Sequence, residues 1–140
     1  MSTIIADNLT GKTSAGDITV TSEGGAATQS LQQGLAKSCA EIGAGGGSLP
    51  DSFNISSLDD DGTGQYGLNF TNNMSNSNYS ASLTMTYDHG IQNASARVIA
   101  VESKTTSSVE IETGYVTSVG IFYQHDIEAN ANSTNHGDLA

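Results

Sequence analysis

The chain contains the stretch Asp51-Ser-Phe-Asn-Ile-Ser-Ser-Leu-Asp-Asp-Asp-Gly-Thr-Gly-Gln-Tyr-Gly-Leu-Asn-Phe-Thr71, in which two runs of alternating apolar and polar residues flank an acidic, glycine-rich cluster. The alternating apolar positions are Phe53, Ile55, Tyr66, Leu68 and Phe70. A period of two places each apolar set on one face of a strand, and the Asp/Gly cluster at 59–64 supplies turn residues. The stretch therefore predicts a β-hairpin whose apolar face the rest of the domain must cover.

Further runs with strand character follow at short intervals, separated by turns rich in Asn, Gly and Ser. They occupy residues 79–87, 97–102, 109–112 and 116–124, with a shorter run at 17–21. The run 97–102 is almost continuously apolar, which is typical of a central strand. In the run 116–124, Val119, Ile121 and Tyr123 fall on one face. This spacing predicts a mainly β fold, an antiparallel β-sandwich.

A helical signal is confined to residues 28–41. Leu31, Leu35 and Ile42 recur at helical spacing behind a Thr or Ser that can cap the helix. The same positions fit a coiled-coil seam, although a seam needs three or four heptads and about two are present. Gly34 costs such a helix roughly 1 kcal/mol relative to Ala. Two interpretations stay open: an oligomerisation seam through Leu31, Leu35 and Ile42, or a helix packed against the sheet.

Composition divides the chain into four parts. We expect an N-terminal attachment arm and oligomerisation helix at 1–42, a Gly-rich linker at 43–50, the β-sandwich domain at 48–125 and an acidic polar tail at 126–140. The arm is either a docking segment or a frayed terminus. The tail has no periodicity, which predicts disorder or, in an assembly, contact with a neighbouring subunit.

The apolar content is low, since hydrophobic residues make up 36% of the chain and Trp is absent. A core this lean is marginal for a single subunit, and burial between subunits is one way to complete it. We therefore expect a homo-oligomer, with a homotrimer as the specific hypothesis.

The charge balance is strongly acidic, with a formal net charge of −11. Binding to nucleic acid requires basic residues that displace counterions from phosphates, so nucleic acid is not expected as a partner. Anionic membranes are disfavoured for the same reason. No run approaches the roughly 18 apolar residues of a membrane helix, and no secretory signal pattern is present. We expect assembly in a cytosol without membrane insertion.

Asp59, Asp60 and Asp61 raise the question of a calcium site. An EF-hand loop alternates its acidic ligands and ends in a Glu, and Leu68 occupies that last position. Three adjacent carboxylates before Gly62 also suit a turn in which side chains bond local amides. The turn is the favoured interpretation, and an inter-subunit calcium site is the alternative. No cofactor is predicted.

Residues with catalytic potential are scattered. His89, His125 and His136 have no metal-ligand spacing and are expected at the surface. Adjacent aspartates invite a Ser-His-Asp interpretation, but such triads are defined by geometry, and no nucleophile-elbow pattern is present. Cys39 is expected to be a small buried residue of the helix. The five tyrosines can offer stacking platforms to a glycan, but most lie on the apolar phase of their strands, which favours core packing. No catalytic residue is predicted, and an enzyme is not expected.

Several motifs of the chain are shared with a known family. They are Asp-x-Phe-Asn-x-Ser-Ser at 51–57, Asp-x-Gly-Thr-Gly-x-Tyr at 60–66, Asn-Phe-Thr-Asn at 69–72, Leu-Gln-Gln-Gly-Leu-Ala-Lys at 31–37 and the N-terminal Met-Ser-Thr-Ile-Ile-Ala-Asp-Asn at 1–8. In these motifs the chain resembles tail-fibre-like virion structural proteins of marine tailed bacteriophages, over most of residues 1–125. The resemblance implies an N-terminal part that docks onto another virion protein and a β head that binds the host surface, such as a surface glycan.

Three functions follow from these expectations. The first is a short tail fibre or fibre component of the virion, attached to a tail adaptor. The second is a capsid decoration or cement protein that stabilises the head lattice. The third is a glycan-processing enzyme of the tail. This hypothesis is remote, because the sequence contains no convincing pair of catalytic carboxylates.

Overall fold

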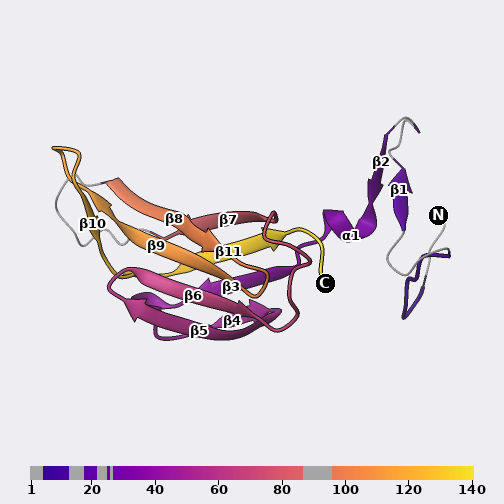
Figure 1. Ribbon diagram of the computed structural model, residues 1–140, viewed down its shortest axis with the longest axis horizontal. Coiled ribbons are helices and arrows are strands. Elements are labelled where there is room, and N and C mark those ends of the chain that lie inside the picture. Colours follow the sequence, from indigo (N-terminus) through magenta and orange to yellow (C-terminus); the bar gives the residue numbers. More distant parts are fainter. Residues whose placement is uncertain (1–4, 13–17, 22–24, 26, 87–95) are drawn as a thin grey trace. The chain divides into compact units, whose positions relative to one another are not determined.

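The computed structural model describes residues 5–12, 18–21, 25, 27–86 and 96–140, and the side chain of Gln33 is left undescribed. The chain forms two compact units, Met1–Leu35 and Ala36–Ala140, called here the N-terminal unit and the β domain. Figure 1 shows their elements along the chain. The sequence placed the main division at the Gly-rich run 43–50. The structure places it within the predicted helix instead.

The fold is mainly β and its sheets are antiparallel, in agreement with the sequence. The strands of the β domain are β3 (Ser38–Ile42), β4 (Asp51–Phe53), β5 (Ile55–Gly62), β6 (Gln65–Phe70), β7 (Ser80–Met85), β8 (Ala96–Lys104), β9 (Ser108–Val116), β10 (Phe122–Gln124) and β11 (Ala131–His136). A four-stranded sheet has the order β4-β3-β11-β7. A five-stranded sheet has the order β10-β9-β6-β5, and β8 pairs with β9 on the side opposite β6.

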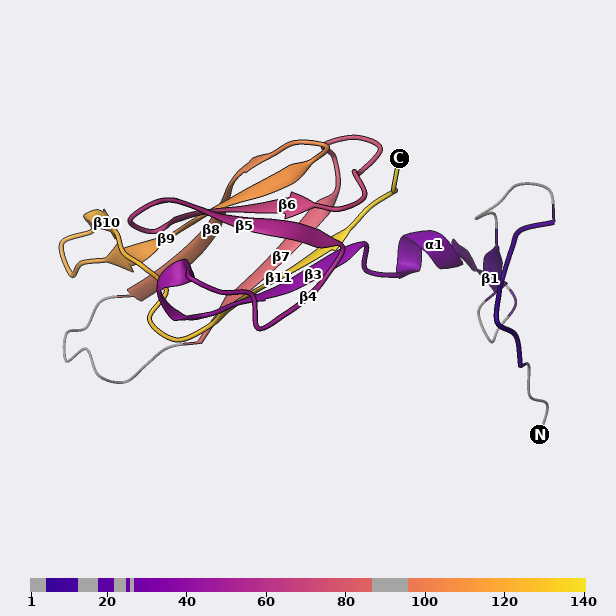
Figure 2. The same cartoon turned by 90° about the horizontal axis from the view of Figure 1, so that it is seen from below.

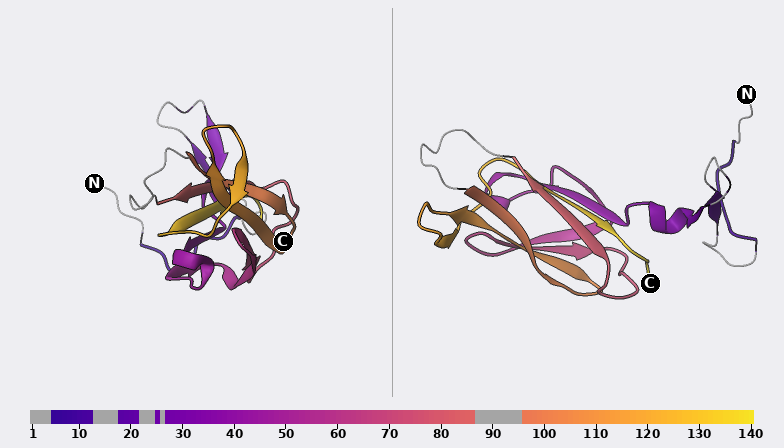
Figure 3. Two further views of the ribbon diagram at one scale, coloured as in Figure 1. Left: turned by 90° about the vertical axis from the view of Figure 1, so that its left-hand side faces the viewer. Right: turned by 90° about the horizontal axis from the view of Figure 1, so that it is seen from above.

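Both sheets contribute to one core. Figure 2 shows the strands of the two sheets from below. Its buried apolar residues are Ala40, Ile42, Tyr66, Leu68, Phe70, Met74, Tyr79, Val109, Ile111, Ile127 and Ala131. In β6 and β9 these residues alternate with outward polar residues, which is the pattern of a strand with one covered face. The two views in Figure 3 show the strands of the β domain from its end and from above.

The quoted stretch forms the expected hairpin, but its turn lies further along the chain. β5 extends to Gly62, so residues 59–61 belong to the strand and Thr63 and Gly64 make the turn to β6. Gly64 has φ +72°, and a Cβ there would overlap the carbonyl oxygen of Thr113. Only glycine combines this backbone conformation with so close an approach. The predicted turn at 59–64 is therefore confirmed only for Thr63 and Gly64, whereas residues 59–61 belong to a strand.

The first predicted strand of that hairpin is broken at Asn54. Phe53 ends β4 in the four-stranded sheet, and Ile55 begins β5 in the five-stranded sheet. Asn54 has φ +58°, a left-handed conformation that Asn adopts more readily than other non-glycine residues. Its side chain amide donates to the carbonyls of Lys37 and Asn72, and its Oδ1 accepts from the backbone and side chain of Asn72. Phe53-Asn54 and Thr71-Asn72 thus hold the chain where it passes from the four-stranded sheet to the five-stranded sheet.

The long helix predicted at 28–41 is wrong. Helix α1 covers only Leu31–Gly34, after the short strand β2 (Thr28–Ser30), and Ser38–Ile42 is strand β3. β3 pairs with β11 on one side and β4 on the other, so tertiary pairing overrides the helical spacing. Ile42 is fully buried in the core and cannot form an oligomer seam with Leu31 and Leu35.

The expected linker and tail are both parts of the β domain. A 3₁₀ turn at Ala44–Gly46 lies between β3 and β4, and Gly46 is buried where a Cβ would overlap the Tyr66 ring. Strand β11, in the predicted tail, is central, since it pairs with β3 and β7. Its inward residues include Ser133 and Asn135, which bond each other and Ser38 instead of forming an apolar stripe.

Two other strand predictions need correction. β8 is an edge strand rather than a central one, since it pairs only with β9 among the described residues. In the run 116–124, Val116 ends β9 and Phe122–Gln124 forms β10, with a chain turn at Gly120 between them. Val119, Ile121 and Tyr123 therefore form no buried face. Strand β7 covers residues 80–85 of the predicted run 79–87, of which residue 87 lies outside the described residues, and the run 109–112 is confirmed as part of β9.

The described part of the N-terminal unit has no buried residue. Strand β1 (Thr19–Thr21) pairs with β2, within the short run predicted at 17–21. Ile5, Leu9, Val20 and Leu35 are exposed. A two-stranded hairpin of this size is marginal by itself in water.

Within the described residues no helix is long and apolar enough to cross a membrane.

Candidate functional site

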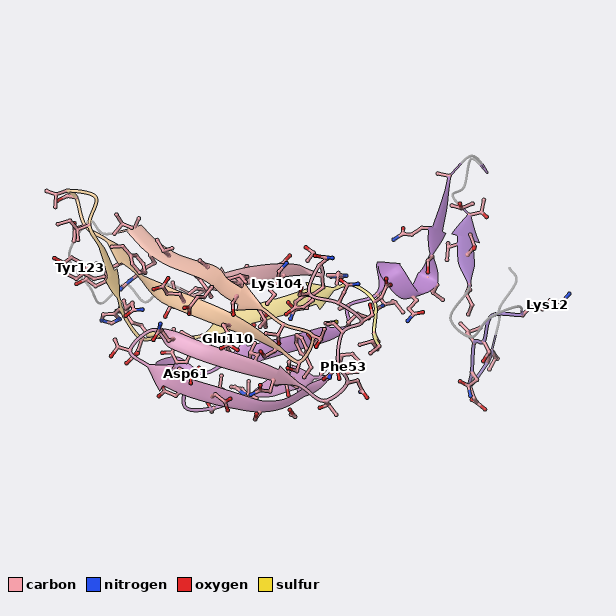
Figure 4. The ribbon with its side chains drawn as sticks, in the orientation of Figure 1. Lys12, Phe53, Asp61, Lys104, Glu110 and Tyr123 are labelled. Atoms are coloured by element: carbon pink, nitrogen blue, oxygen red, sulfur yellow. The ribbon has the colours of Figure 1, made fainter. Side chains whose placement is uncertain are left out.

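The three consecutive aspartates lie on β5, the edge of the five-stranded sheet. Asp59, Asp61 and Glu110 surround the position that a Cβ of Gly67 would take on the outer face, and Figure 4 labels two of these acidic residues. Asp60 lies opposite Tyr66 in the strand register. Within the described ranges, no group of three or more His, Cys, Asp or Glu side chains could hold a metal ion. An exposed strand edge lined with like charges resists pairing with another chain, which gives these carboxylates a structural role.

Tyr66 joins three segments at the β5–β6 turn. Its hydroxyl donates to Asp126 Oδ1 at 3.2 Å and accepts from the Ile127 amide at 3.2 Å. Asp126 Oδ1 also accepts from the Gly64 amide at 2.7 Å. Burial, with the nearby Asp126 carboxylate as a smaller cause, raises the pKa of Tyr66 to about 12. This network fixes the segment that follows β10.

Tyr79 is the second core tyrosine. Its hydroxyl donates to the Ser108 carbonyl at 2.7 Å, and its ring meets Phe70 edge to face with centroids 5.7 Å apart. Lys104 Nζ donates to the Tyr79 carbonyl at 2.6 Å and lies over the ring. Burial raises the pKa of Tyr79 to about 12. For Tyr66 and Tyr79 the predicted core packing is confirmed.

Tyr115 and Tyr123 have a different environment, near the β9–β10 connection. Their rings stack with centroids 5.6 Å apart and an interplanar angle of 22°. His125 meets Tyr115 edge to face, and the Arg97 guanidinium lies over the same ring and pairs with Glu128. Tyr115 shares a strand face with Ile111, so this cluster continues the inner face of the five-stranded sheet beyond the buried core.

The connection after β9 together with strand β10, residues 117–124, is called here the β9–β10 tip. It carries four exposed large apolar residues, namely Val119, Ile121, Phe122 and Tyr123. Val119 is 77% exposed and Tyr123 is 48% exposed, so the cluster contributes little to the core of its own domain. Phe122 lies across Gly114, where a Cβ would be 2.6 Å from the ring. Clustered apolar exposure of this kind makes the tip a candidate surface for contact with another molecule.

A second surface feature is a hollow of about 140 Å³ on the outer face of the four-stranded sheet. It is lined by Cys39, Ala40, Glu41, Asp51, Asn132, Ser133 and Thr134. We call it the outer hollow. Glu41 Oε1 accepts a hydrogen bond from Asn130 Nδ2 at 2.5 Å, which orients the carboxylate. Cys39, expected to be buried in a helix, is partly exposed here in β3.

The structure does not assemble a catalytic triad from the described histidines. His125 Nδ1 is 3.0 Å from the Asp126 carbonyl and 3.7 Å from Glu128 Oε1, and His136 lies in β11. No described Ser hydroxyl bonds either ring. His89 lies outside the described residues.

The sequence does not predict the contacts of Arg97 and Asp126. Nor does it predict that Phe53 is exposed, opposite Cys39 in the pairing of β4 with β3. The left-handed conformation of Asn54 breaks the run and places Phe53 in a different sheet from Ile55. In the sequence, the indication of this break is an Asn between two short apolar–polar runs.

Comparison of the chain with known protein families, with curated proteins and with solved structures finds no match.

Proposed function

We propose that this chain is a structural protein of a phage virion, a short tail fibre or fibre component. Its N-terminal unit attaches to a neighbouring virion protein, and its β domain, a β-sandwich, presents a contact surface to the host. The motifs at 51–57, 60–66 and 69–72 support this assignment through their resemblance to tail-fibre-like proteins. The role is one of binding, without catalysis.

The observation that carries the proposal is the placement of two features within the β domain. The chain enters the domain at Ala36, and β3 begins at the end where β11 finishes and Lys37 bonds Asn135. Figure 1 shows β10 at the opposite end of the domain. A domain tethered at one end with exposed apolar residues at the other suits a protein that is anchored on a particle and contacts a partner away from the anchor.

Self-association through the N-terminal unit is part of the same proposal. Leu31 and Leu35 remain the candidate oligomerisation residues, because Ile42 belongs to the core. Most of the acidic residues fall in 36–140, so copies of the N-terminal unit can approach with less repulsion than copies of the β domain. We propose a homotrimer held through residues 1–35.

A capsid decoration protein is the second proposal, and the apolar β9–β10 tip is compatible with it. Val119, Ile121 and Phe122 suit a contact with another protein, such as a capsid subunit, as well as they suit a host surface.

Gold-labelled antibody against residues 36–140 on intact particles tests the two proposals. Label on the tail supports the fibre. Label spread regularly over the head supports decoration and overturns the fibre. Particles without label overturn the virion assignment, provided that the same antibody detects the chain in infected cells.

A further inference from the structure

Phe53 is an exposed aromatic residue beside the outer hollow. It is 59% exposed and lies opposite Cys39 in the register of β4 with β3. Residues directly opposite each other in an antiparallel pair share a face and lie about 5 Å apart at Cβ. Ser38, Ala40 and Ile42 point inward, so Phe53 and Cys39 face outward. Phe53 therefore borders the outer hollow.

The outer hollow carries both hydrogen-bond donors and acceptors. Asp51 lies opposite Glu41, and Asn132 lies opposite Glu41 from the other side. Thr134 lies opposite Cys39 in the pairing of β11 with β3. In the described part of the chain, the side chains of Asp51, Asn132 and Thr134 have no intramolecular hydrogen-bond partner. Glu41 is held in place by Asn130.

An aromatic ring beside uncommitted carboxylate, amide and hydroxyl groups matches the two sides of a sugar. A pyranose ring has a face of C–H groups that packs on an aromatic ring, and hydroxyls at its edge that both donate and accept. The volume of the hollow, about 140 Å³, accommodates part of one ring with the remainder over Phe53. A small apolar ligand would instead leave the polar groups of the hollow desolvated without partners.

The local charge restricts the class of sugar. Glu41 and Asp51 are both acidic, the net charge of the chain is −11, and no Lys or Arg among the described residues lines the outer hollow. An anionic sugar would meet like charge without a compensating cation. The charge of this surface therefore disfavours an anionic ring.

We propose that Phe53 and the outer hollow form a binding site for one neutral pyranose ring. Phe53 stacks on the C–H face of the ring, and Asp51, Asn132 and Thr134 bond its hydroxyls. The site is distinct from the β9–β10 tip, since Figure 4 shows Phe53 and Tyr123 toward opposite ends of the β domain. The proposal rests on the proposed function only in that a host-surface glycan would be the natural source of such a ring.

Titration of the full chain with methyl β-D-galactopyranoside, methyl β-D-glucopyranoside and methyl α-D-mannopyranoside tests the proposal. Binding is followed by saturation-transfer difference NMR and by amide chemical shifts, with the methyl glycoside of N-acetylneuraminic acid as the anionic probe. We expect at least one neutral glycoside to bind with a Kd of about 1 mM, shifting amides of β3, β4 and β11. We expect binding of the anionic probe to be at least about tenfold weaker.

Variants then locate the ring. Phe53→Ser and Asp51→Asn should each weaken binding by about tenfold, and Phe53→Tyr should retain it within about threefold. Asp61→Asn, at an exposed carboxylate on β5 of the other sheet, is the matched control for Asp51→Asn and should change nothing. No binding of any neutral glycoside overturns the proposal, as does binding that Phe53→Ser and Asp51→Asn leave intact, or equal binding of the anionic probe. Location of the chain on the capsid would overturn the fibre proposal and leave this site standing, so the two failures are distinguishable.

Discussion

Asn54 shows how one side chain directs the chain from one sheet to the other. Its left-handed backbone and four side-chain hydrogen bonds act together, so two substitutions are needed to separate them. Asn54→Gly keeps the conformation and loses the bonds, and we expect it to lower the free energy of unfolding by about 2–3 kcal/mol. Asn54→Ala loses the same bonds and also places a Cβ in the left-handed conformation, so we expect a loss about 1–2 kcal/mol larger than that of Asn54→Gly. Urea unfolding measures both, and equal losses for the two variants would contradict a role for the backbone.

The burial of Tyr66 and Tyr79 is expected to make the stability of the β domain fall at alkaline pH. Each is neutral when buried, with a pKa raised from 10.0 to about 12. Below pH 10 both side chains are protonated in the folded and unfolded chain, so their contribution to stability is constant. Between pH 10 and about 12 the unfolded chain ionises first, and the free energy of unfolding falls as pH rises.

Urea unfolding across this pH range, with tyrosinate absorbance near 295 nm, checks that expectation. Tyr66→Phe should remove part of the pH dependence, because Phe has no proton to lose. Ionisation of all the tyrosines close to pH 10 in a chain that is still folded would contradict the burial of Tyr66 and Tyr79.

At the scale of elements, the 3₁₀ turn between β3 and β4 offers a matched pair of glycines. Gly45 and Gly46 have φ values of +69° and +67°, but only Gly46 packs against the Tyr66 ring. Gly45→Ala should therefore cost only the left-handed strain, about 1–2 kcal/mol. Gly46→Ala must also displace Tyr66, which adds about 1–3 kcal/mol. Thermal unfolding compares them, and similar Tm values would show that the turn does not pack on Tyr66.

The acidic edge of β5 makes a second prediction about an element. Asp59→Asn with Asp61→Asn removes two like charges from an open strand edge, so we expect faster self-association of the chain. Light scattering over time at fixed protein concentration measures it. Asp7→Asn with Asp138→Asn removes the same net charge elsewhere and is the control. If both pairs aggregate at the same rate, net charge rather than the edge is responsible.

The same scale shows which elements sequence patterns can predict. β6 and β9 have bulky inward residues such as Leu68, Val109 and Ile111, so their period of two is visible. β11 buries Ser133 and Asn135, and its position rests on pairing with β3 and β7. An apolar periodicity cannot predict such a strand. The candidate site was missed for a related reason: alternation placed Phe53 with Ile55, whereas Asn54 sends Phe53 to the outside of the other sheet.

At the scale of the whole molecule, two surfaces of the β domain are suited to contacts. The β9–β10 tip is apolar and lies away from the point where the chain enters the domain, whereas the outer hollow is polar and bordered by Phe53. Ile121→Ser should leave stability nearly unchanged, because the side chain is 51% exposed, and should weaken attachment of particles to host cells in the fibre proposal. Adsorption counts on intact cells measure this, and unchanged adsorption would argue against the tip as the host contact.

The measurement that tests the central proposal most directly is cryo-electron microscopy of the intact particle at a resolution that traces this chain. The fibre proposal predicts density on the tail, with residues 1–35 of several copies packed together against a neighbouring tail protein and the β9–β10 tip facing outward. Density between capsid subunits, with the tip inserted against one of them, would contradict it and establish the chain as a decoration protein.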